Sequence, residues 1–300
     1  MTGSAMSYAR GMTPRLPPVS PNGPWERSKL PSPSFGRSAA LGVFEGYVRG
    51  FDLRDPQIAL KYEHTLNVAE LCAEIARGGG MGPDDVDLAW LCGLLHDIGR
   101  FEQLRMWGTF RDSESVSHAR LGLTILEGAG LTGAELGDGE GLLPRFTGDP
   151  AWASVIKPAV GLHSDLRLPD GLDPRVRAFC EIVRDADKVD IVRVFSQGEC
   201  EAILGLAPDE FARGGISDEA MVGFRERRCL GPDDRRASLD GLVGVICLAF
   251  ELTSDVADEA LGERGYLGDL IERPFGLSPR FADPDTRSKW DEIARAMSWR

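Results

Sequence analysis

The sequence predicts an all-α fold, and three observations support this class. Apolar residues recur at spacings of three and four positions over long segments, which is the pattern of amphipathic or buried helices. Glycine and proline lie between these segments, where helices end and begin. No segment shows the alternation of apolar and polar residues that is typical of a half-buried strand, and no internal repeat is evident.

The chain of 300 residues is predicted to contain three regions. Residues 1–38 are rich in Pro, Ser, Gly and Arg and have few apolar side chains, so we expect a disordered N-terminal tail. A tag or a wrongly assigned start is the alternative interpretation of this segment. Residues 39–203 form the predicted main domain. Residues 204–300 form a helical extension that packs on it and either closes one side of the functional site or makes a homodimer contact.

The first helices are predicted from clear start and stop signals. A short helix over 40–51 precedes Asp55, an N-cap residue that is followed by proline at the first helical position. The helix that begins there runs to about Arg77 and stops at the glycines of 78–80. His64 lies on its apolar face, at spacings of three and four from its apolar neighbours.

The next predicted helix begins at Pro83 and ends at Gly99, and its sequence VDLAWLCGLLHDIG is apolar on nearly all sides. Such a helix is normally central and buried. We interpret the segments 101–117 and 132–148 as loops. Further helices are predicted over 116–129, 150–163, 174–196, 235–258 and 284–299.

Composition excludes several classes of function. The net charge of −13 and the pI near 4.9 argue against a broad surface for nucleic acid polymers or anionic membranes. No apolar run reaches the roughly 18 residues of a transmembrane helix, and no apolar segment of a secretory signal is present at the N-terminus. Six cysteines without a C-x-x-C pair fit free thiols in a reducing compartment, so we expect a cytoplasmic protein.

The four histidines of the chain are its strongest functional signal. His64, His96, His118 and His163 each lie in or at the end of a predicted helix. A single histidine on an apolar face is usually a satisfied core residue. Burying four imidazoles without partners, however, costs free energy each time. One shared metal centre would satisfy all of them, because neutral imidazole is a common ligand.

Asp97 is the first candidate carboxylate ligand. It follows His96 directly, and adjacent helical residues point about 100° apart. Both side chains can therefore reach one ion only near a helix end, which Gly99 provides.

A further carboxylate is predicted from the 174–196 helix. Asp187 shares an apolar face of that helix, where an unpaired carboxylate would be expensive. Asp190, three positions further on, is the alternative ligand. We expect Asp185, on another face, to contact solvent or to pair locally.

Together these motifs resemble the HD-domain superfamily of metal-dependent phosphohydrolases. The resemblance rests on EHTLNVAELC around His64, on LLHDIGR around His96, and on DADKVD around Asp187. VSHARLG and VGLHSD resemble the segments that carry the additional histidines of the two-metal branch. The resemblance covers residues 58–195 and implies an HD-domain-like helical bundle with additional C-terminal helices.

The resemblance also implies a ligand set. The first metal would be held by four side chains: His64, His96, Asp97 and Asp187. The second metal would be held by three: Asp97 as a bridge, His118 and His163, although His163 could instead be a cation at a helix C-terminus. Mixed imidazole and carboxylate ligands suit Mn, Fe, Co, Ni or Zn better than Ca, and Mg is also compatible. We therefore expect one or two divalent metal ions that activate a water for attack on phosphorus.

A small phosphorylated molecule is the expected partner. Arg100 follows the His-Asp doublet and could hold phosphate and stabilise developing charge, or could be a helix C-terminal cation. Arg184 could contact phosphate or a metal-binding carboxylate, or form a surface salt bridge. In the segment 101–117, Trp107 and Phe110 could stack on a base or sugar, or could instead plug the core. Two more arginines of that segment are candidates for phosphate binding: Arg105 and Arg111.

The sequence thus predicts a phosphomonoesterase or phosphodiesterase that acts on a nucleotide or other small phosphate ester, with Asp97 and Arg100 as catalytic residues. It lacks the GYP-type signature of the cyclic dinucleotide branch and the acidic pair of the alarmone hydrolase branch. Two alternatives stay open. One is a di-iron oxygenase on the same scaffold, and the other is a nucleotide-binding regulatory module without turnover.

Overall fold

The computed structural model describes residues 36–128, 141–147 and 152–298. Within these ranges all regular secondary structure is helical, which confirms the predicted all-α class. The predicted tail 1–38, apart from its last three residues, and most of the predicted loop 132–148 lie outside the described residues.

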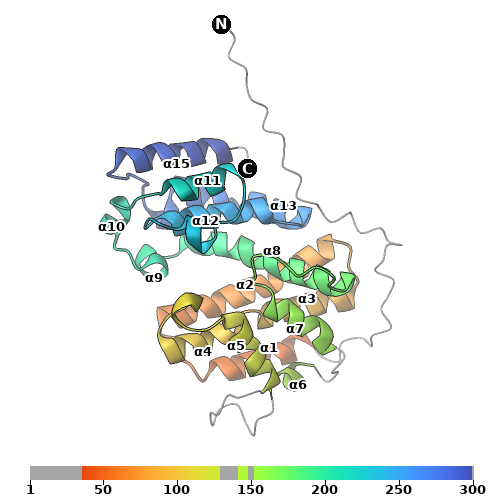
Figure 1. Cartoon of the computed structure of the whole chain (residues 1–300). Helices are drawn as coiled ribbons and strands as arrows, with labels where there is room; N and C mark the ends of the chain where they lie inside the picture. The colour runs from red at the N-terminus through yellow and green to blue at the C-terminus, as the bar shows by residue number, and fades with distance from the viewer. Residues whose placement is uncertain (1–35, 129–140, 148–151, 299–300) are drawn as a thin grey trace.

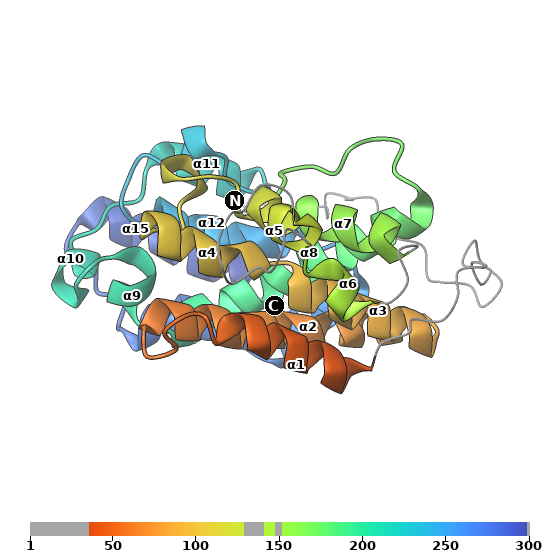
Figure 2. The same cartoon turned by 90° about the horizontal axis from the view of Figure 1, so that it is seen from below.

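One layer of the molecule is formed by the helices that precede residue 162 (Figure 1). Its pair α2 and α3 is joined by a short turn, and α1 runs along the outside of the layer when the molecule is seen from below (Figure 2). The elements of this layer are α1 (Arg37–Val48), α2 (Pro56–Gly78), α3 (Pro83–Leu95), α4 (Ile98–Trp107), η1 (Asp112–Glu114), α5 (His118–Glu127), α6 (Leu143–Phe146) and α7 (Ala153–Gly161).

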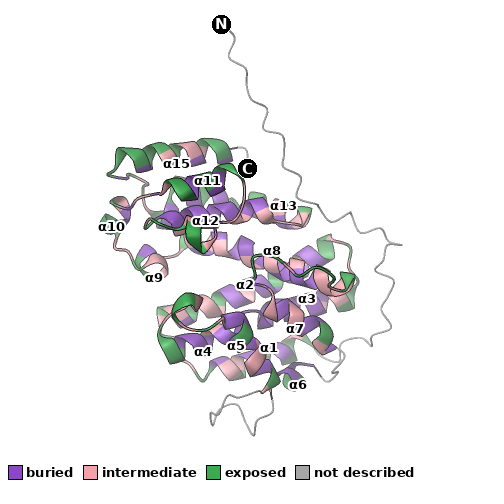
Figure 3. Cartoon of the chain, in the orientation of Figure 1, coloured by how far each residue is buried: buried purple, intermediate pink, exposed green. Residues whose placement is uncertain are grey.

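Helix α8 (Pro174–Gln197) lies between this layer and the C-terminal helices, and it packs against both. Its start is fixed by Asp173, whose side chain accepts hydrogen bonds from the first free backbone N–H groups. The C-terminal elements are α9 (Cys200–Leu204), α10 (Pro208–Ala212), α11 (Asp218–Arg225), η3 (Pro232–Asp234), α12 (Asp240–Leu248), η4 (Ala249–Glu251), α13 (Asp255–Glu263), α14 (Tyr266–Glu272), η5 (Pro274–Gly276) and α15 (Pro284–Met297). Buried residues are concentrated on the facing sides of the two layers (Figure 3).

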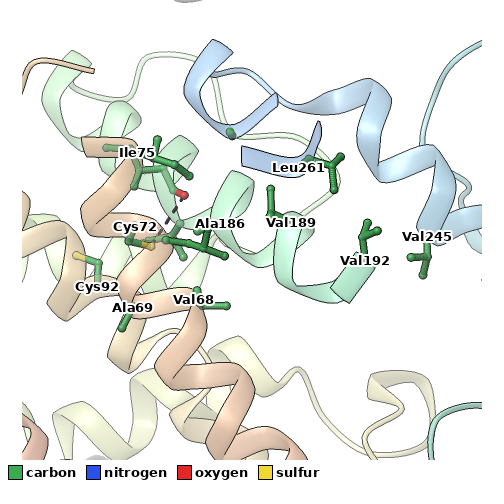
Figure 4. Packing of buried hydrophobic residues seen from close by; sticks show 14 of the residues in the cluster. Val68, Ala69, Cys72, Ile75, Cys92, Ala186, Val189, Val192, Val245 and Leu261 are labelled. Atoms are coloured by element: carbon green, nitrogen blue, oxygen red, sulfur yellow. Dashed lines mark hydrogen bonds between the residues drawn. The ribbon is translucent and has the colours of Figure 1, made fainter. Parts of the chain in front are cut away.

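Small residues let the helices that carry the histidines approach closely. Figure 4 shows Val68 and Cys72 of α2 beside Ala186 of α8 in the buried core. A Cβ atom at Gly93 of α3 would lie 2.8 Å from the Cα atom of Ala69, and one at Gly99 of α4 would lie 2.2 Å from a backbone oxygen of α5. Both glycines are therefore required by backbone contacts between helices rather than by turns.

Two predicted elements differ from the structure. The segment 101–117 is not entirely a loop, because α4 continues to Trp107 and buries Phe101 and Leu104 on one face. The predicted helix 235–258 is interrupted between α12 and α13. The three short helices of 200–225 were not predicted.

Lys188 Nζ lies 3.7 Å from Asp185 Oδ1, so the predicted local pairing is present, but the predicted solvent contact of Asp185 is wrong. This side chain is buried, and it accepts hydrogen bonds from the backbone N–H groups of Thr253 and Ser254 and from the Thr253 hydroxyl. The carboxylate therefore satisfies backbone donors at the N-terminus of α13 and fixes the interruption before that helix. In the described part of the chain, no helix is long and apolar enough to cross a membrane.

Candidate metal centre

Six side chains from five parts of the chain converge in the layer that contains α2 and α3. They are His64 on α2, His96 and Asp97 in the turn between α3 and α4, His118 at the start of α5, His163 just after α7 and Asp187 on α8. The four imidazole rings follow one another at centroid separations of 4.9–5.3 Å. No histidine of the cluster is more than 5% exposed. The spatial convergence that a metal site requires is therefore present.

The first group of ligand atoms lies on the side of α2 and α8. His64 Nε2 lies 3.1 Å from Asp187 Oδ1 and 3.6 Å from Asp97 Oδ2. His96 Nε2 lies 3.7 Å from the same Asp187 oxygen and 3.6 Å from the same Asp97 oxygen. Two imidazole nitrogens and two carboxylate oxygens thus surround one point.

The second group uses the other oxygen of Asp97. Asp97 Oδ1 lies 3.5 Å from His118 Nε2 and 3.6 Å from His163 Nε2. These two nitrogens lie 2.9 Å apart. Because each oxygen of Asp97 faces a different group, this carboxylate is placed to bridge two cations.

The Nδ1 atoms of all four rings are held by partners outside the cluster. His96 and His163 donate to the carbonyl oxygens of Gly93 and Val160, both at 2.7 Å. The two remaining contacts are made by carboxylates: Asp190 at 2.7 Å from His64 Nδ1, and Asp112 at 2.8 Å from His118 Nδ1. Such partners fix the ring orientation and direct Nε2 toward a metal.

The arrangement fits a metal because it leaves electron pairs without partners. A carbonyl oxygen can only accept, so the rings of His96 and His163 must carry their proton on Nδ1, and Nε2 is then a lone-pair acceptor. Among the described residues, His64 Nε2, His96 Nε2 and Asp97 Oδ1 are buried without a hydrogen-bond partner. Burying such atoms is costly, and divalent transition-metal ions are suited to the mixed nitrogen and oxygen set that they form.

The protonation states near neutral pH favour metal binding. Burial lowers the pKa of both His96 and His118 to about 4, so these imidazoles are neutral. Burial opposes ionisation of Asp97, but Lys61 and His96 hold the pKa of this carboxyl well below its usual range. His64 differs: burial and Lys61 lower its pKa, while hydrogen bonds to Asp187 and Asp190 outweigh them and raise it.

Two cations flank the bridging carboxylate. Lys61 Nζ lies 2.7 Å from Asp97 Oδ2, and Arg100 Nε lies 3.4 Å from Asp97 Oδ1. Both side chains also lie over the ring of Phe110, at 5.7 and 5.8 Å from its centroid. Lys61 was missed by the sequence analysis. The sequence could have indicated Lys61, because it lies one helical turn before His64 and therefore on the same side of α2.

The segment after α4 is tied to the cluster by a polar network. Gln103 is fully buried and donates to Asp112 and to the carbonyl of Val116. Arg100 donates to the carbonyl of Phe110 and to Asp112. The hydrogen bond with His118 is the main effect that opposes burial and lowers the pKa of Asp112 to about 2, so its carboxylate is charged when it orients that ring. Asp112 was also missed.

The other predicted substrate residues are placed differently. Arg111 lies in the cavity lining beside Lys61. Arg105 pairs with Glu102 at 2.8 Å and lies over the ring of Phe51, and Trp107 is exposed at the end of α4. These contacts give Arg105 a place in the packing of α4.

Arg184 also has partners other than those expected. Its guanidinium donates to the backbone carbonyls of residues Leu162, His163, Asp165 and Leu166. It therefore holds the turn that carries His163, and a phosphate contact of Arg184 stays a prediction.

A cavity of about 370 Å³ opens beside the cluster. His64 and Lys61 line it, together with residues of the 109–111 segment, the C-terminal part of α8 and α9. The cluster thus has an adjoining space that could accommodate a small organic molecule.

The fold and the cluster define a helical domain with buried histidines and aspartates that could hold a metal ion. Residues 62–191 match the family model of the HD domain, and all six side chains of the cluster lie within the match. Residues 62–191 are therefore similar to the HD domain, the domain that characterises a superfamily of metal-dependent phosphohydrolases. No curated protein and no solved structure matches the chain.

Proposed function

We propose that this protein is a metal-dependent phosphohydrolase that cleaves a nucleotide or another small phosphate ester. The observation that carries the proposal is the position of Asp97. Its two carboxylate oxygens face two separate sets of imidazole nitrogens, and a cation flanks each oxygen. This is the arrangement expected for two divalent ions and the phosphate oxygens that bind between them and the protein.

Both groups of ligand atoms contribute to holding the metals. The first group would use His64, His96, Asp97 and Asp187, and the second would use Asp97, His118 and His163. When bound, the metals supply a water of lowered pKa as nucleophile and balance charge on the attacking and leaving oxygens.

The protein's own residues orient and neutralise the substrate. Arg100 Nε is buried without a hydrogen-bond partner among the described residues, so it is free to donate to a phosphate oxygen. Lys61 places its ammonium group between the cluster and the cavity, where a phosphate entering from the cavity would meet it. The buried rings exclude water from the other sides, which strengthens these charge interactions.

The test combines metal analysis with an activity panel. Protein purified without added metal is analysed for its elements, and is then assayed for phosphate release from nucleotides and simple esters with Mn, Fe, Co, Ni, Zn or Mg. We expect metal-dependent release from at least one ester. No release with any metal would contradict the proposal. Oxygen uptake by the iron-loaded protein would then support the oxygenase alternative, and nucleotide binding without turnover would support the regulatory one.

A further inference from the structure

The cavity beside the metal centre is partly built by residues outside the matched HD domain. Val194 and Phe195 at the end of α8 and residues 202–205, in and directly after α9, line it, and all of them follow residue 191. This wall is therefore a feature of this chain that the HD domain alone does not supply.

The wall is apolar and only partly covered. Ile191 and Phe195 of α8 and Ile203 and Leu204 of α9 are half-buried hydrophobic side chains that line the cavity. Partly exposed apolar side chains gathered around one hollow indicate a binding surface, because leaving them in water costs free energy. Glu201 is the single carboxylate of the lining, and it is exposed.

The cationic part of the lining is beside the metal centre. Lys61 belongs both to the cavity and to the Asp97 ion pair, whereas Arg111, which also lines the cavity, is paired with Glu114 at 2.9 Å. The cavity therefore combines the ammonium group of Lys61 at the reacting centre with an apolar wall on α8 and α9. A phosphate ester has the same two parts, a charged phosphoryl group and an organic group.

We infer that the α8–α9 wall binds the organic group of the ester, and that this group is predominantly apolar. The inference rests on the proposed function, since it places the phosphoryl group at the metal centre. Binding energy from an organic group that does not react can be used to orient the reacting phosphate, so the wall contributes to catalytic efficiency as well as to affinity.

Ala202 is the best position for a test. Ile203 is less suitable, because its side chain packs closely against the backbone at Gly198. A Cβ atom added to Gly198 would lie 2.3 Å from Ile203 Cδ1. Ala202 is half-buried, lines the cavity and has a small side chain, so Ala202→Phe fills the cavity without removing packing. Val222 is an exposed apolar residue of α11 outside the cavity lining, and Val222→Phe is the matched control.

The experiment compares hexyl phosphate with ethyl phosphate, whose leaving alcohols are about equally basic. We expect the wild-type kcat/KM to be about tenfold or more higher for hexyl phosphate, because additional methylene groups are buried. Ala202→Phe should reduce the hexyl value by about the same factor and leave the ethyl value nearly unchanged, while Val222→Phe changes neither. Equal rates with the two esters, or equal losses for both in Ala202→Phe, would overturn the inference.

Failure of the proposed function is distinguishable from failure of the cavity inference. If neither ester is hydrolysed, the proposed function has failed, and calorimetric titration with hexyl phosphate then tests the cavity alone. Binding that is retained in Val222→Phe and lost in Ala202→Phe supports the apolar wall. No binding, or equal binding by both variants, overturns it.

Discussion

The Nε2 atoms of His118 and His163 lie 2.9 Å apart in the buried centre of the cluster. The Nδ1 atom of His163 must donate to the carbonyl of Val160, and that of His118 contacts the carboxylate of Asp112. Rings that carry their single proton on Nδ1 present two Nε2 lone pairs to each other. A shared cation removes this repulsion, and the nearby Asp97 oxygen makes the same point favourable for a positive charge.

The first prediction follows from the bridging position of Asp97. Asp97→Ala should lose both metal ions, because each group loses one of its oxygens, whereas His163→Ala should lose mainly one. Elemental analysis after purification at equal metal concentration measures both effects. We expect kcat to fall about a thousandfold or more in Asp97→Ala, since charge stabilisation at the reacting centre is lost.

The exposed Asp170 provides a matched control for that experiment. Asp170→Ala should keep the wild-type metal content and kcat. Unchanged metal content in Asp97→Ala would contradict the bridging role.

The carboxylates that hold the rings should tune metal affinity. Asp190→Asn weakens the contact with His64 and so acts on the first group, while Asp112→Asn acts on His118 and the second. We expect metal affinity to fall about 10–100-fold in each variant, with activity largely recovered at saturating metal. Titration against a competing chelator measures the affinities. Wild-type affinity in both variants would show that these carboxylates do not orient the ligands.

Lys61 should act on the substrate rather than on the metal. Lys61→Met removes the ammonium group 2.7 Å from Asp97 Oδ2, so metal binding should be kept or strengthened because a competing cation is gone. Loss of the phosphate contact should lower kcat/KM by about 10²-fold or more. Arg100→Ala should likewise spare the metal and reduce turnover.

Arg105→Ala is the matched control for these substitutions, because Arg105 pairs with Glu102. It should leave kcat/KM near the wild-type value, because the guanidinium of Arg105 contacts Glu102 and Phe51 and not the cluster. If Lys61→Met keeps the wild-type kcat/KM, Lys61 does not contribute to binding the substrate.

The sequence alone could predict the six clustered side chains because polar residues on apolar helix faces need a common partner. Lys61 and Asp112 could not be found in that way. They lie at partly exposed positions where a charge needs no explanation, and only the fold brings them to the cluster. Metal binding by the cluster itself stays a prediction for the experiments above.

The prediction of a loop after Gly99 failed for an identifiable reason. Glycine was interpreted as a helix stop, but at Gly99 it allows the close approach of α4 to the backbone at His118. Phe101 and Leu104 are buried and lie three positions apart, and this apolar spacing indicates a helix after Gly99 rather than a loop. The burial of Asp185 was missed because its partners, the backbone groups of 253–254, are almost 70 positions away in the sequence.

The metal-free protein should lose stability as the pH falls from about 6.5 to about 4. Burial lowers the folded pKa of His96 and of His118 from the ordinary 6.5 to about 4, so in this window the unfolded chain binds protons that the folded one does not. Each pKa unit corresponds to about 1.4 kcal/mol for each group. The raised pKa of His64 has the opposite sign, because its contribution is present at low pH and is lost as the pH rises through the folded value.

The free energy of unfolding of the metal-free protein should therefore rise with pH over this range. The two groups with lowered pKa values, His96 and His118, outweigh the one group with a raised pKa, His64. Urea unfolding in the presence of a chelator at pH 7.0, 5.5 and 4.5 measures this free energy, and His96→Gln should flatten the curve. A metal-free protein whose unfolding free energy does not change over this range would contradict the buried, neutral state of these rings.

The two aspartates of α8 that lie two positions apart should have separable effects. Asp185→Ala leaves the N–H groups of Thr253 and Ser254 without their acceptor, and should lower the free energy of unfolding by about 2–3 kcal/mol while metal content is unchanged. Asp187→Ala should instead reduce metal content, since its oxygen lies 3.1 Å from His64 Nε2. Asp185→Asn keeps one acceptor oxygen and should be less destabilising than Asp185→Ala. Chemical unfolding and elemental analysis of the same samples separate the two effects. Loss of metal in Asp185→Ala at wild-type stability would show that the ligand on this helix had been assigned to the wrong residue.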